Sequence, residues 1–295
     1  MCEFISKGDV DYPLLLKKIP DAPESLYFKG RYRPEIFDNC LAVVGSRRMT
    51  GYGKSTTSKL IYEIAAQGVT IVSGFMYGID MTAHRTALAA GGKTIAVLAY
   101  GIKRNPPNYL RETYDEILAS GGLVVSELAE NEPPKKWSFP KRNRIIAGLS
   151  QAVLVVEASL KSGSLITAKY AKSYQRKIFA VPGPINSHNS SGTLQLISEG
   201  AEMVLDAQQI VDFYGIARGE HGGQLSEGLC KEAANSRQTN TKGEIISYIR
   251  EQPSTLDELT AVVERPVTEI NIELTRLMLA GQVIEEEGRF HARYR

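Results

Sequence analysis

Cysteine is rare in this chain, and the few cysteines are far apart. Cys2, Cys40 and Cys230 are scattered, with no C-x-x-C pair among them. This arrangement argues against a disulfide framework and against a zinc site, and it is typical of a protein from a reducing compartment. We therefore expect a cytoplasmic protein without a bound metal.

The sequence also lacks a long apolar run. Residues 1–7 are neither basic nor followed by an apolar stretch, so no signal peptide is predicted. The most continuous apolar run, residues 152–156, is far shorter than the roughly 20 residues of a membrane-spanning helix. These absences argue against a membrane partner. The 43% hydrophobic and 23% charged residues are those of an ordinary globular protein.

Charge of one sign is not in large excess either. The formal net charge is +2, from 35 Lys and Arg against 33 Asp and Glu. Residues 1–240 hold 28 of these cations and 23 of the acids, which leaves 7 cations and 10 acids for residues 241–295. The main body is mildly basic and the tail mildly acidic. A bias this small does not identify a nucleic-acid partner, so the positions of the cations have to decide.

From residue 41 onward the sequence alternates short β-branched runs with helical patterns. The expected strands are residues 41–44, 70–73, 94–98, 123–126, 152–156 and 178–181, and the expected helices are residues 54–66, 81–90, 108–119, 142–149 and 164–174. Apolar strands separated by helices predict an α/β fold, an extended Rossmann-like, doubly wound, mostly parallel sheet over residues 41–214. Residues 1–40 are expected to form an N-terminal extension packed on this core.

The alternation stops at residues 215–240, which are rich in Gly, Ser, Asn and Gln and predict a linker. Residues 241–295 then predict a small C-terminal domain with helices over residues 243–251, 256–263 and 266–280, followed by a two-stranded hairpin. Ser254 is expected to cap the second helix, and Gly281 to end the third. Three helices and a hairpin favour a winged-helix domain.

The first strand of the core ends in a Gly-Ser-Arg-Arg turn, Gly45 to Arg48, that leads into a helix. Such a turn exposes backbone N–H groups and the positive end of the helix dipole, which favour an anion. A P-loop would need glycine where Arg48 stands, so the Gly-Lys-Ser at residues 53–55 does not complete one, and a dinucleotide fingerprint is also missing. The turn predicts a phosphate-sized anion site with two arginines. The alternative is a merely structural glycine turn.

The loop after the second strand carries Asp80 and His84, four residues apart. Side chains at this spacing share one face of a helix, which would suit catalysis or a metal ion. Because a third ligand is missing, we favour the interpretation that Asp80 is the N-cap of the following helix.

Residues 135–144 (KKWSFPKRNR) combine five Lys and Arg with Trp137 and Phe139 and contain no acid. Sites for single-stranded nucleic acid use cations for the backbone and aromatic faces for the bases, at about 1–3 kcal/mol per stacked base. The stretch therefore indicates single-strand binding. The alternative is a solvated loop whose aromatic side chains are buried, followed by an amphipathic helix.

A further strand-to-helix junction contains Lys161, Ser162, Gly163 and Ser164. It offers a cation, two hydroxyls and a helix N-terminus to an anion. Ligands of doubly wound sheets bind outside the carboxyl ends of the strands. We therefore expect this junction, Arg47 and the 135–144 stretch to line one cleft.

Together these residues resemble the DNA-processing protein A (DprA/Smf) family over about residues 11–214. The most specific blocks are FPKRNRIIAGLS at residues 139–150 and KSGSLITA at residues 161–168, and Gly-Ser-Arg at residues 45–47 and Gly-Ile-Asp at residues 78–80 agree as well. The resemblance implies a homodimer that binds single-stranded DNA without sequence preference. It also implies that the protein loads RecA in natural transformation or recombination, with single-strand-binding protein as a further partner, and that it has no cofactor and no enzymatic activity.

Carried over to this chain, the resemblance implies a DNA-binding set on three segments: Gly45, Ser46, Arg47, Phe139, Lys141, Arg142, Asn143, Arg144, Lys161, Ser162, Gly163 and Ser164. One departure concerns the two positions before Gly-Ile-Asp. The family usually has a small residue and an arginine there, whereas this chain has Met76 and Tyr77. We expect the departure to affect the loop more than the function.

The leading alternative is an enzyme, a nucleotide phosphoribohydrolase of the lysine-decarboxylase-like Rossmann group, which is similar in fold and in its glycine junctions. That group is expected to show a Pro-Gly-Gly-x-Gly-Thr run, but here Pro182-Gly183 leads to Pro184. A Rossmann oxidoreductase is a third hypothesis, weakened by the missing dinucleotide fingerprint. The recombination mediator is the interpretation that we favour.

Overall fold

A computed structural model of the chain describes residues 3–128, 130–216, 244–251, 254–263, 267–286 and 288–292. The chain divides into two compact units, Met1–Ala217 and Arg218–Arg295. Of the linker expected at residues 215–240, all but the first two residues lie outside the described part. In the part that is described, no helix combines the length and the apolar character needed to cross a membrane.

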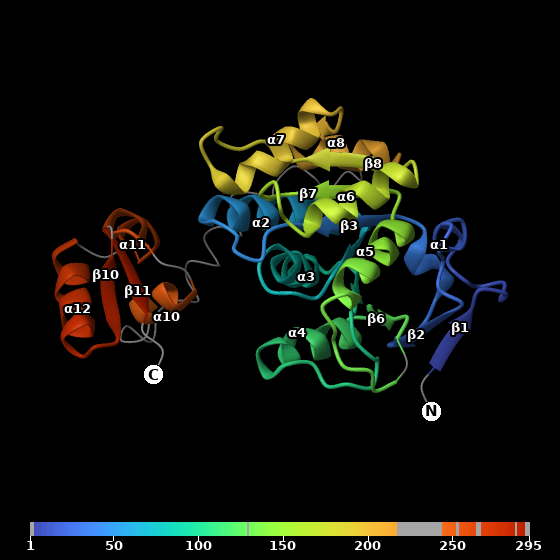
Figure 1. The fold of residues 1–295 in the computed structure, drawn as a ribbon, viewed down its shortest axis with the longest axis horizontal. Coiled ribbons are helices and arrows are strands. Elements are labelled where there is room, and N and C mark those ends of the chain that lie inside the picture. Colours follow the sequence, from blue (N-terminus) through green and yellow to red (C-terminus); the bar gives the residue numbers. More distant parts are fainter. Residues whose placement is uncertain are drawn as a thin grey trace. The chain divides into compact units, whose positions relative to one another are not determined.

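The first unit is built on one nine-stranded sheet (Figure 1) with the order β1-β2-β6-β5-β4-β3-β7-β8-β9. The strands are β1 (Glu3–Ser6), β2 (Ser25–Lys29), β3 (Cys40–Val44), β4 (Thr70–Ser73), β5 (Thr94–Val97), β6 (Leu123–Ser126), β7 (Ala152–Val155), β8 (Lys177–Ala180) and β9 (Glu202–Met203). All neighbours from β6 to β9 are parallel, and β1 and β2 are antiparallel. The predicted mostly parallel α/β fold is confirmed.

Helices cover both faces of this sheet, because its central strands are apolar on both sides. Leu41 and Val43 of β3 share a core with one set of helices, and Ala42 and Val44 share a core with another. The first set is α2 (Gly51–Ala66), α3 (Ile79–Ala89) and α8 (Ala207–Phe213), with α4 (Asn108–Ala119) beside α3 over β5 and β6. The second set is α1 (Leu14–Lys17), α5 (Ser138–Leu149) and α6 (Ser164–Ser173), of which α5 and α6 lie side by side.

The N-terminal residues both extend the sheet and pack on its core. Strand β2 pairs with β6, with Tyr27 opposite Ser126, and β1 then pairs with β2. Helix α1 contributes Leu16 to the core beneath α5. The sequence reading did not predict these two edge strands, and it also missed β9, α8, α7 (Ser191–Ser198) and the short 3-10 helices Pro34–Phe37 and His188–Ser190.

Helix α5 begins at Ser138, four residues before the predicted start at Arg142. The interpretation of residues 135–141 as a loop is therefore wrong for Phe139 and Lys141, which lie in the first helical turn. Pro140 does not prevent this, because the first N–H groups of a helix have no intrahelical acceptor. The aromatic and basic side chains of this segment are thus held on a helix.

The strand order creates a crevice beside β3. From β3 the chain continues through β4, β5 and β6 in one direction across the sheet, whereas β7, β8 and β9 lie in the other direction. The loops after β3 and β7 therefore leave to opposite sides, which is the switch point where doubly wound folds bind ligands.

The second unit contains α10 (Glu244–Glu251), α11 (Leu256–Val263), α12 (Val267–Leu279) and an antiparallel hairpin of β10 (Val283–Glu286) and β11 (Arg289–Ala292). Its small core includes Ile245, Leu259, Leu274 and Phe290. The winged-helix assignment stays a prediction, because residues 252–253, 264–266, 287 and 293–295 lie outside the described part.

The cap of α11 is Thr255 and not Ser254. The backbone N–H of Glu258 donates to Thr255 Oγ1 at 3.2 Å, and the N–H of Thr255 donates to the Glu258 carboxylate at 2.9 Å. This is a capping box, which satisfies two donors reciprocally. Ser254 instead forms an isolated bridge with Phe290 of the hairpin.

Gly45 allows the end of β3 to approach the start of α3. A Cβ atom on Gly45 would lie 2.6 Å from Ile79 Cγ1 and 3.1 Å from the carbonyl oxygen of Glu157. Both neighbours are buried, so neither has room to move. Gly163, at the other junction of the crevice, has nothing within 4 Å of such an atom and a helical φ of −62°.

We expect Gly45→Ala to lower the free energy of unfolding by about 1–3 kcal/mol, the usual cost of overpacking. The control Gly163→Ala should leave it unchanged or raise it by about 0.4–1 kcal/mol, because the unfolded chain loses freedom. Urea unfolding followed by the fluorescence of Trp137, the single tryptophan of the chain, reports on this unit. Equal losses in the two variants would show that the β3–α3 contact is not tight.

Candidate nucleic-acid interface

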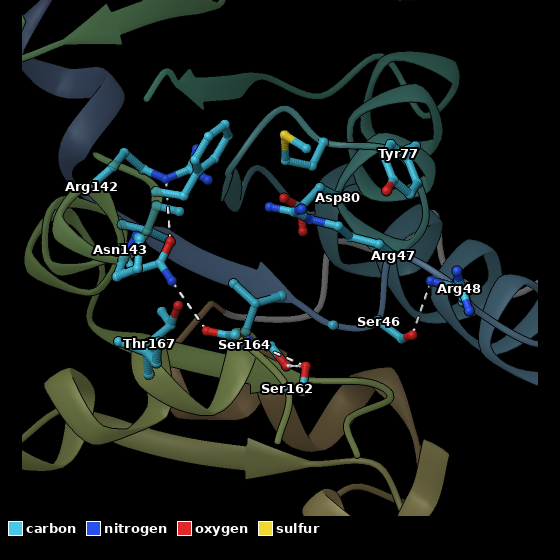
Figure 2. Close-up of a pocket in the computed structure, with 18 of the residues that line it drawn as sticks. Ser46, Arg47, Arg48, Tyr77, Asp80, Arg142, Asn143, Ser162, Ser164 and Thr167 are labelled. Carbon is cyan, nitrogen blue, oxygen red and sulfur yellow. Dashed lines mark hydrogen bonds between the residues drawn. The ribbon is translucent and has the colours of Figure 1, made fainter. Parts of the chain in front are cut away.

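A cavity of about 840 Å³ opens at the carboxyl ends of β3 and β7 (Figure 2). The three segments expected to share a cleft do converge here. Of the predicted residues, the cavity is lined by Gly45, Ser46, Arg47, Phe139, Arg142, Asn143, Ser162, Gly163 and Ser164. Lys141, Arg144 and Lys161 are not among the lining residues.

Arg47 is exposed and lies between two aromatic rings. Its guanidinium carbon is 5.4 Å from the ring centroid of Phe139 and 5.9 Å from that of Tyr77. Both distances are those of cation–π contacts, which orient the guanidinium plane as well as attract it. Tyr77 remains 48% exposed. Tyr77, one of the two residues that depart from the family pattern, therefore supplies part of this cluster.

The predicted anion site at the N-terminus of α2 is occupied by the protein itself. The Glu157 carboxylate accepts hydrogen bonds from the backbone N–H of Thr50 at 2.8 Å and from its hydroxyl at 2.5 Å. Thr50 in turn caps Gly53 N–H at 3.2 Å. This part of the prediction is wrong, since a side chain 107 positions away fills the place expected for a phosphate. Arg47 and Arg48 face the neighbouring cavity instead.

The same helix start excludes a P-loop. Residues 53–55, the Gly-Lys-Ser sequence, lie inside α2 and not in a loop before it. A Cβ atom on Gly53 would lie 2.4 Å from the Glu157 carboxylate, so this glycine serves the contact with Glu157. No phosphate-binding loop forms at this position.

Arg142 reaches the cavity from a buried position, with 4% of its surface exposed. Its Nη1 donates to the carbonyl oxygens of Gly74 and Val97, which follow β4 and end β5. Burial lowers the pKa of Arg142 to about 10, against the opposing attraction of Asp80, so the group is still charged at neutral pH. It therefore contributes positive charge to the floor of the cavity but not a free guanidinium.

Asp80 is not the N-cap of α3. The cap is Gly78, with a positive φ of 86°, and Asp80 lies in the first turn with its carboxyl group facing the cavity. Burial raises the pKa of Asp80 to about 6, an effect that Arg142 and Arg47 partly oppose. The carboxyl group thus titrates near neutral pH at the floor of a basic pocket.

His84 lies elsewhere, in the core. Its Nδ1 is 2.7 Å from Thr94 Oγ1, and its ring is near that of Phe75. Burial lowers the pKa of His84 to about 3, so the imidazole is neutral at neutral pH. Among the described residues no three His, Cys, Asp or Glu side chains group as metal ligands would.

Arg144 and Lys141 both pair with Glu127. Arg144 is 4% exposed, forms an ion pair with the Glu127 carboxylate, and has its Nε 3.3 Å from Asp21. Lys141 Nζ is 3.5 Å from the same carboxylate of Glu127. Arg144 therefore ties α5 to the N-terminal segment and to the loop after β6, and its burial does not support the predicted contact with DNA. Lys161 is exposed at the edge of the α6 junction.

The α6 junction presents hydroxyl groups to the cavity. The hydroxyls of Ser162 and Ser164 are 2.7 Å apart, and Asn143 Nδ2 donates to the carbonyl oxygen of Gly163 at 3.2 Å. Thr167, one turn further along α6, is buried, and its hydroxyl has no hydrogen-bond partner within the described part of the chain. Figure 2 shows Asn143, Ser164 and Thr167 on the opposite side of the view from Tyr77.

Sequence reasoning missed several residues of this site. Lys135 and Lys136 line the cavity. Both belong to the basic stretch at residues 135–144, and their position just before α5 could have identified them. Tyr77 is an exposed aromatic residue in a strand-end loop, which is a weaker signal. His188 and Asn189 also line the cavity, and Asn189 donates to the Arg48 carbonyl oxygen at 2.7 Å. They come from a separate turn after β8, and nothing in the sequence places that turn here.

The cavity is suited to an extended anion that carries flat groups. Its cations are Arg47, Arg48, Lys135, Lys136 and Arg142. Within the described part of the chain, Asp80 is the one carboxylate among the lining residues. Cations with interleaved aromatic faces are the arrangement found in single-strand sites.

Comparisons with known proteins identify the family of the chain. Residues 3–215 match the family DNA recombination-mediator protein A. Protein Smf of Synechocystis is 34% identical in an alignment that covers 99% of this chain and 80% of that protein. The DNA processing protein DprA of Streptococcus pneumoniae is 42% identical over 68% of this chain and 70% of its own length.

Two solved structures share the fold. The X-ray structure of DprA from Streptococcus pneumoniae has a TM-score of 0.66 and 40% identity, and covers 72% of this chain and 74% of that one. A structure of DNA processing protein A from Helicobacter pylori, which concerns the single-stranded DNA binding mode of that protein, has a TM-score of 0.63 and 32% identity, and covers 72% of this chain and 95% of that one. The chain therefore belongs to the DNA recombination-mediator protein A family, which includes the DprA and Smf proteins.

Proposed function

We propose that this protein binds single-stranded DNA in the cavity beside β3 and delivers the strand to RecA. The observation that carries the proposal is Arg47, an exposed cation between the rings of Phe139 and Tyr77. This cluster offers a charge for a phosphate and aromatic faces for bases at the same place.

A single strand fits such a cluster better than a duplex does. Bases of a single strand are free to stack on Phe139 and Tyr77, whereas the faces of paired bases are covered by their neighbours. Stacking and phosphate contacts distinguish poorly between bases, so binding is expected to tolerate any sequence. The relative from Helicobacter pylori, a single-stranded DNA binder of the same fold, supports this assignment.

The remaining lining residues suit the sugar-phosphate backbone. Arg48, Lys135 and Lys136 supply charge around the cavity, and Ser162, Ser164 and Thr167 supply hydroxyl donors along α6. The Thr167 hydroxyl is a notable support, because a buried polar group without a partner is costly unless a ligand or water satisfies it. Arg142 acts beneath them as a fixed positive charge.

Family membership, together with what a mediator requires, supports the proposal that the strand is delivered to RecA. A mediator and RecA compete for the same phosphates of the strand. A mediator therefore has to hold the strand and also bring RecA to it at a raised local concentration. We expect the protein to act as a homodimer on strands covered by single-strand-binding protein. We also expect it to have no ATPase activity of its own, since residues 53–55 do not form a P-loop.

The strand's phosphates should make binding strongly dependent on salt. If about 4–6 phosphates are neutralised, the slope of log affinity against log salt should be roughly −3 to −4 for oligo-dT. Arg47→Ala should weaken binding about 5- to 100-fold and make the slope shallower by about 0.7. Fluorescence anisotropy of a labelled oligonucleotide measures both quantities.

The matched control is Arg111→Ala, which removes an exposed arginine paired with Asp115 on α4, away from the cavity. Its affinity should stay close to that of the wild type. Equal losses for Arg47 and Arg111, or a wild-type slope near zero, would contradict the assignment of the strand to this cavity.

Asp80 should make binding dependent on pH. Above its pKa of about 6 the carboxylate repels nearby phosphates, and below it the protonated group does not. The affinity for oligo-dT should therefore rise several-fold as the pH falls through about 6. Asp80→Asn should bind more tightly than the wild type at neutral pH and show a flat profile.

The pH series is best measured in a His188→Gln background, because His188 also lines the cavity and its removal restricts the comparison to Asp80. Thymine and the phosphates do not titrate near the pKa of Asp80, so the oligonucleotide adds no slope. A pH dependence that survives in the Asp80→Asn protein would show that another group is responsible.

RecA delivery is tested separately from binding. On DNA covered by single-strand-binding protein, the wild type should shorten the lag before RecA hydrolyses ATP, and Arg47→Ala should shorten it less. Without RecA, no ATP hydrolysis is expected. If the wild type binds the strand but leaves the lag unchanged, the function reduces to single-strand binding.

A further inference from the structure

Trp137 is a large aromatic side chain that the cavity does not use. It is 50% exposed and immediately precedes α5, yet it is not among the residues that line the cavity. Lys135 Nζ lies 5.4 Å from the centroid of its ring and Lys141 Nζ lies 5.8 Å from it. The indole is thus accompanied by two cations while half of its surface stays open.

This cluster contains the same two kinds of group as the cavity, cations and aromatic rings, in different numbers. In the cavity, one cation lies between two rings, and here two cations accompany one ring. Lys135 belongs to both places, since it lines the cavity and also contacts Trp137. A strand that leaves the cavity past Lys135 therefore meets the indole next.

The backbone that carries the indole is held in place by the turn around it. Ser138 is 3% exposed, and its hydroxyl oxygen lies 2.7 Å from the carbonyl oxygen of Ala99 and 2.8 Å from that of Lys135, either of which can accept its proton. The same hydroxyl accepts from Lys135 N–H at 3.1 Å, and Lys141 N–H donates to the Trp137 carbonyl oxygen at 3.2 Å. A ring on an anchored turn loses little freedom when a flat ligand stacks on it, so stacking there is favoured.

We propose that Trp137, with Lys135 and Lys141, is a second base-stacking position on the same DNA strand, outside the cavity. The inference rests on the proposed function, because it places the indole on the path of a strand held by Arg47 and Phe139. The two lysines attract the phosphates that flank the stacked base, and the indole supplies a face that accepts any base. Glu132 lies 3.8 Å from Lys135 Nζ, and Glu127 lies 3.5 Å from Lys141 Nζ. These carboxylates neutralise part of the charge of the two lysines, and the remainder is available to the strand.

The position predicts a dependence on strand length. A very short oligonucleotide fills the cavity and does not reach Trp137, whereas a longer one occupies both places. The test uses labelled oligo-dT from about 4 to about 16 nucleotides, the range of single-strand site sizes. Anisotropy measures binding, and emission from Trp137, the single tryptophan of the chain, measures stacking at this ring alone.

We expect short oligonucleotides to bind with little change in tryptophan emission and longer ones to quench it. Trp137→Ala should weaken binding of the longer strands at least about five-fold and leave the short ones nearly unchanged, and Trp137→Phe should recover part of the loss. The control Tyr109→Ala removes another exposed aromatic residue, on α4 and outside the cavity, and should not affect either length.

Two failures can be told apart. If anisotropy shows binding at every length but emission never changes, and Trp137→Ala binds all lengths as the wild type does, the second position is refuted and the cavity assignment stands. In that case the exposed indole of Trp137 does not contact DNA, and contact with a protein partner becomes the interpretation to test. If the wild type shows no binding at any length, the proposed function itself fails, and the second position fails with it.

Discussion

The guanidinium of Arg142 is buried where two strands and a helix meet, and the geometry of the cavity depends on it. It extends from α5 and donates to the carbonyl oxygens that follow β4 and end β5. Gly74 follows the last residue of β4 and Val97 is the last residue of β5, so one guanidinium bonds the ends of two neighbouring strands. A single side chain thus fixes α5, which carries Phe139 and Asn143, against the strand ends that carry the loop of Tyr77.

Burying this cation is costly unless it is neutralised and fully hydrogen-bonded. Asp80 supplies the opposing charge, and the close packing of both side chains against Gly74 shows how little room is left: a Cβ atom there would lie 2.6 Å from each of them. The same burial raises the pKa of the Asp80 carboxyl group to about 6. The Asp80 carboxylate is therefore present in the pocket because it neutralises the buried Arg142. It opposes an anionic ligand, and the exposed cations around the cavity have to outweigh it.

Much of the site could be predicted from the sequence, because parallel strands place their carboxyl ends at one edge. All six predicted strands agree with the structure to within one residue at either end, and the loops containing Arg47 and Ser162 converge as expected. Contacts between distant positions could not be predicted. Nothing near residue 50 indicates that Glu157 accepts hydrogen bonds from Thr50 at the start of that helix, and nothing near residue 144 indicates that Arg144 is paired with Asp21 and Glu127. A basic motif shows which cations are present but not which of them are already neutralised.

The cations of the site therefore fall into two groups: those bonded within the protein and those exposed to solvent. Arg142 and Arg144 are 4% exposed and bonded within the protein, so they determine shape, and salt in the solvent screens them little. Arg47 and Arg48 are exposed at the end of β3, and Lys135 and Lys136 are exposed before α5, where counterions can reach them. Only the exposed group can exchange counterions for phosphates, so only that group contributes to salt-dependent affinity. The motif FPKRNR therefore combines one ring that lines the cavity with two arginines that hold the fold on which that ring depends.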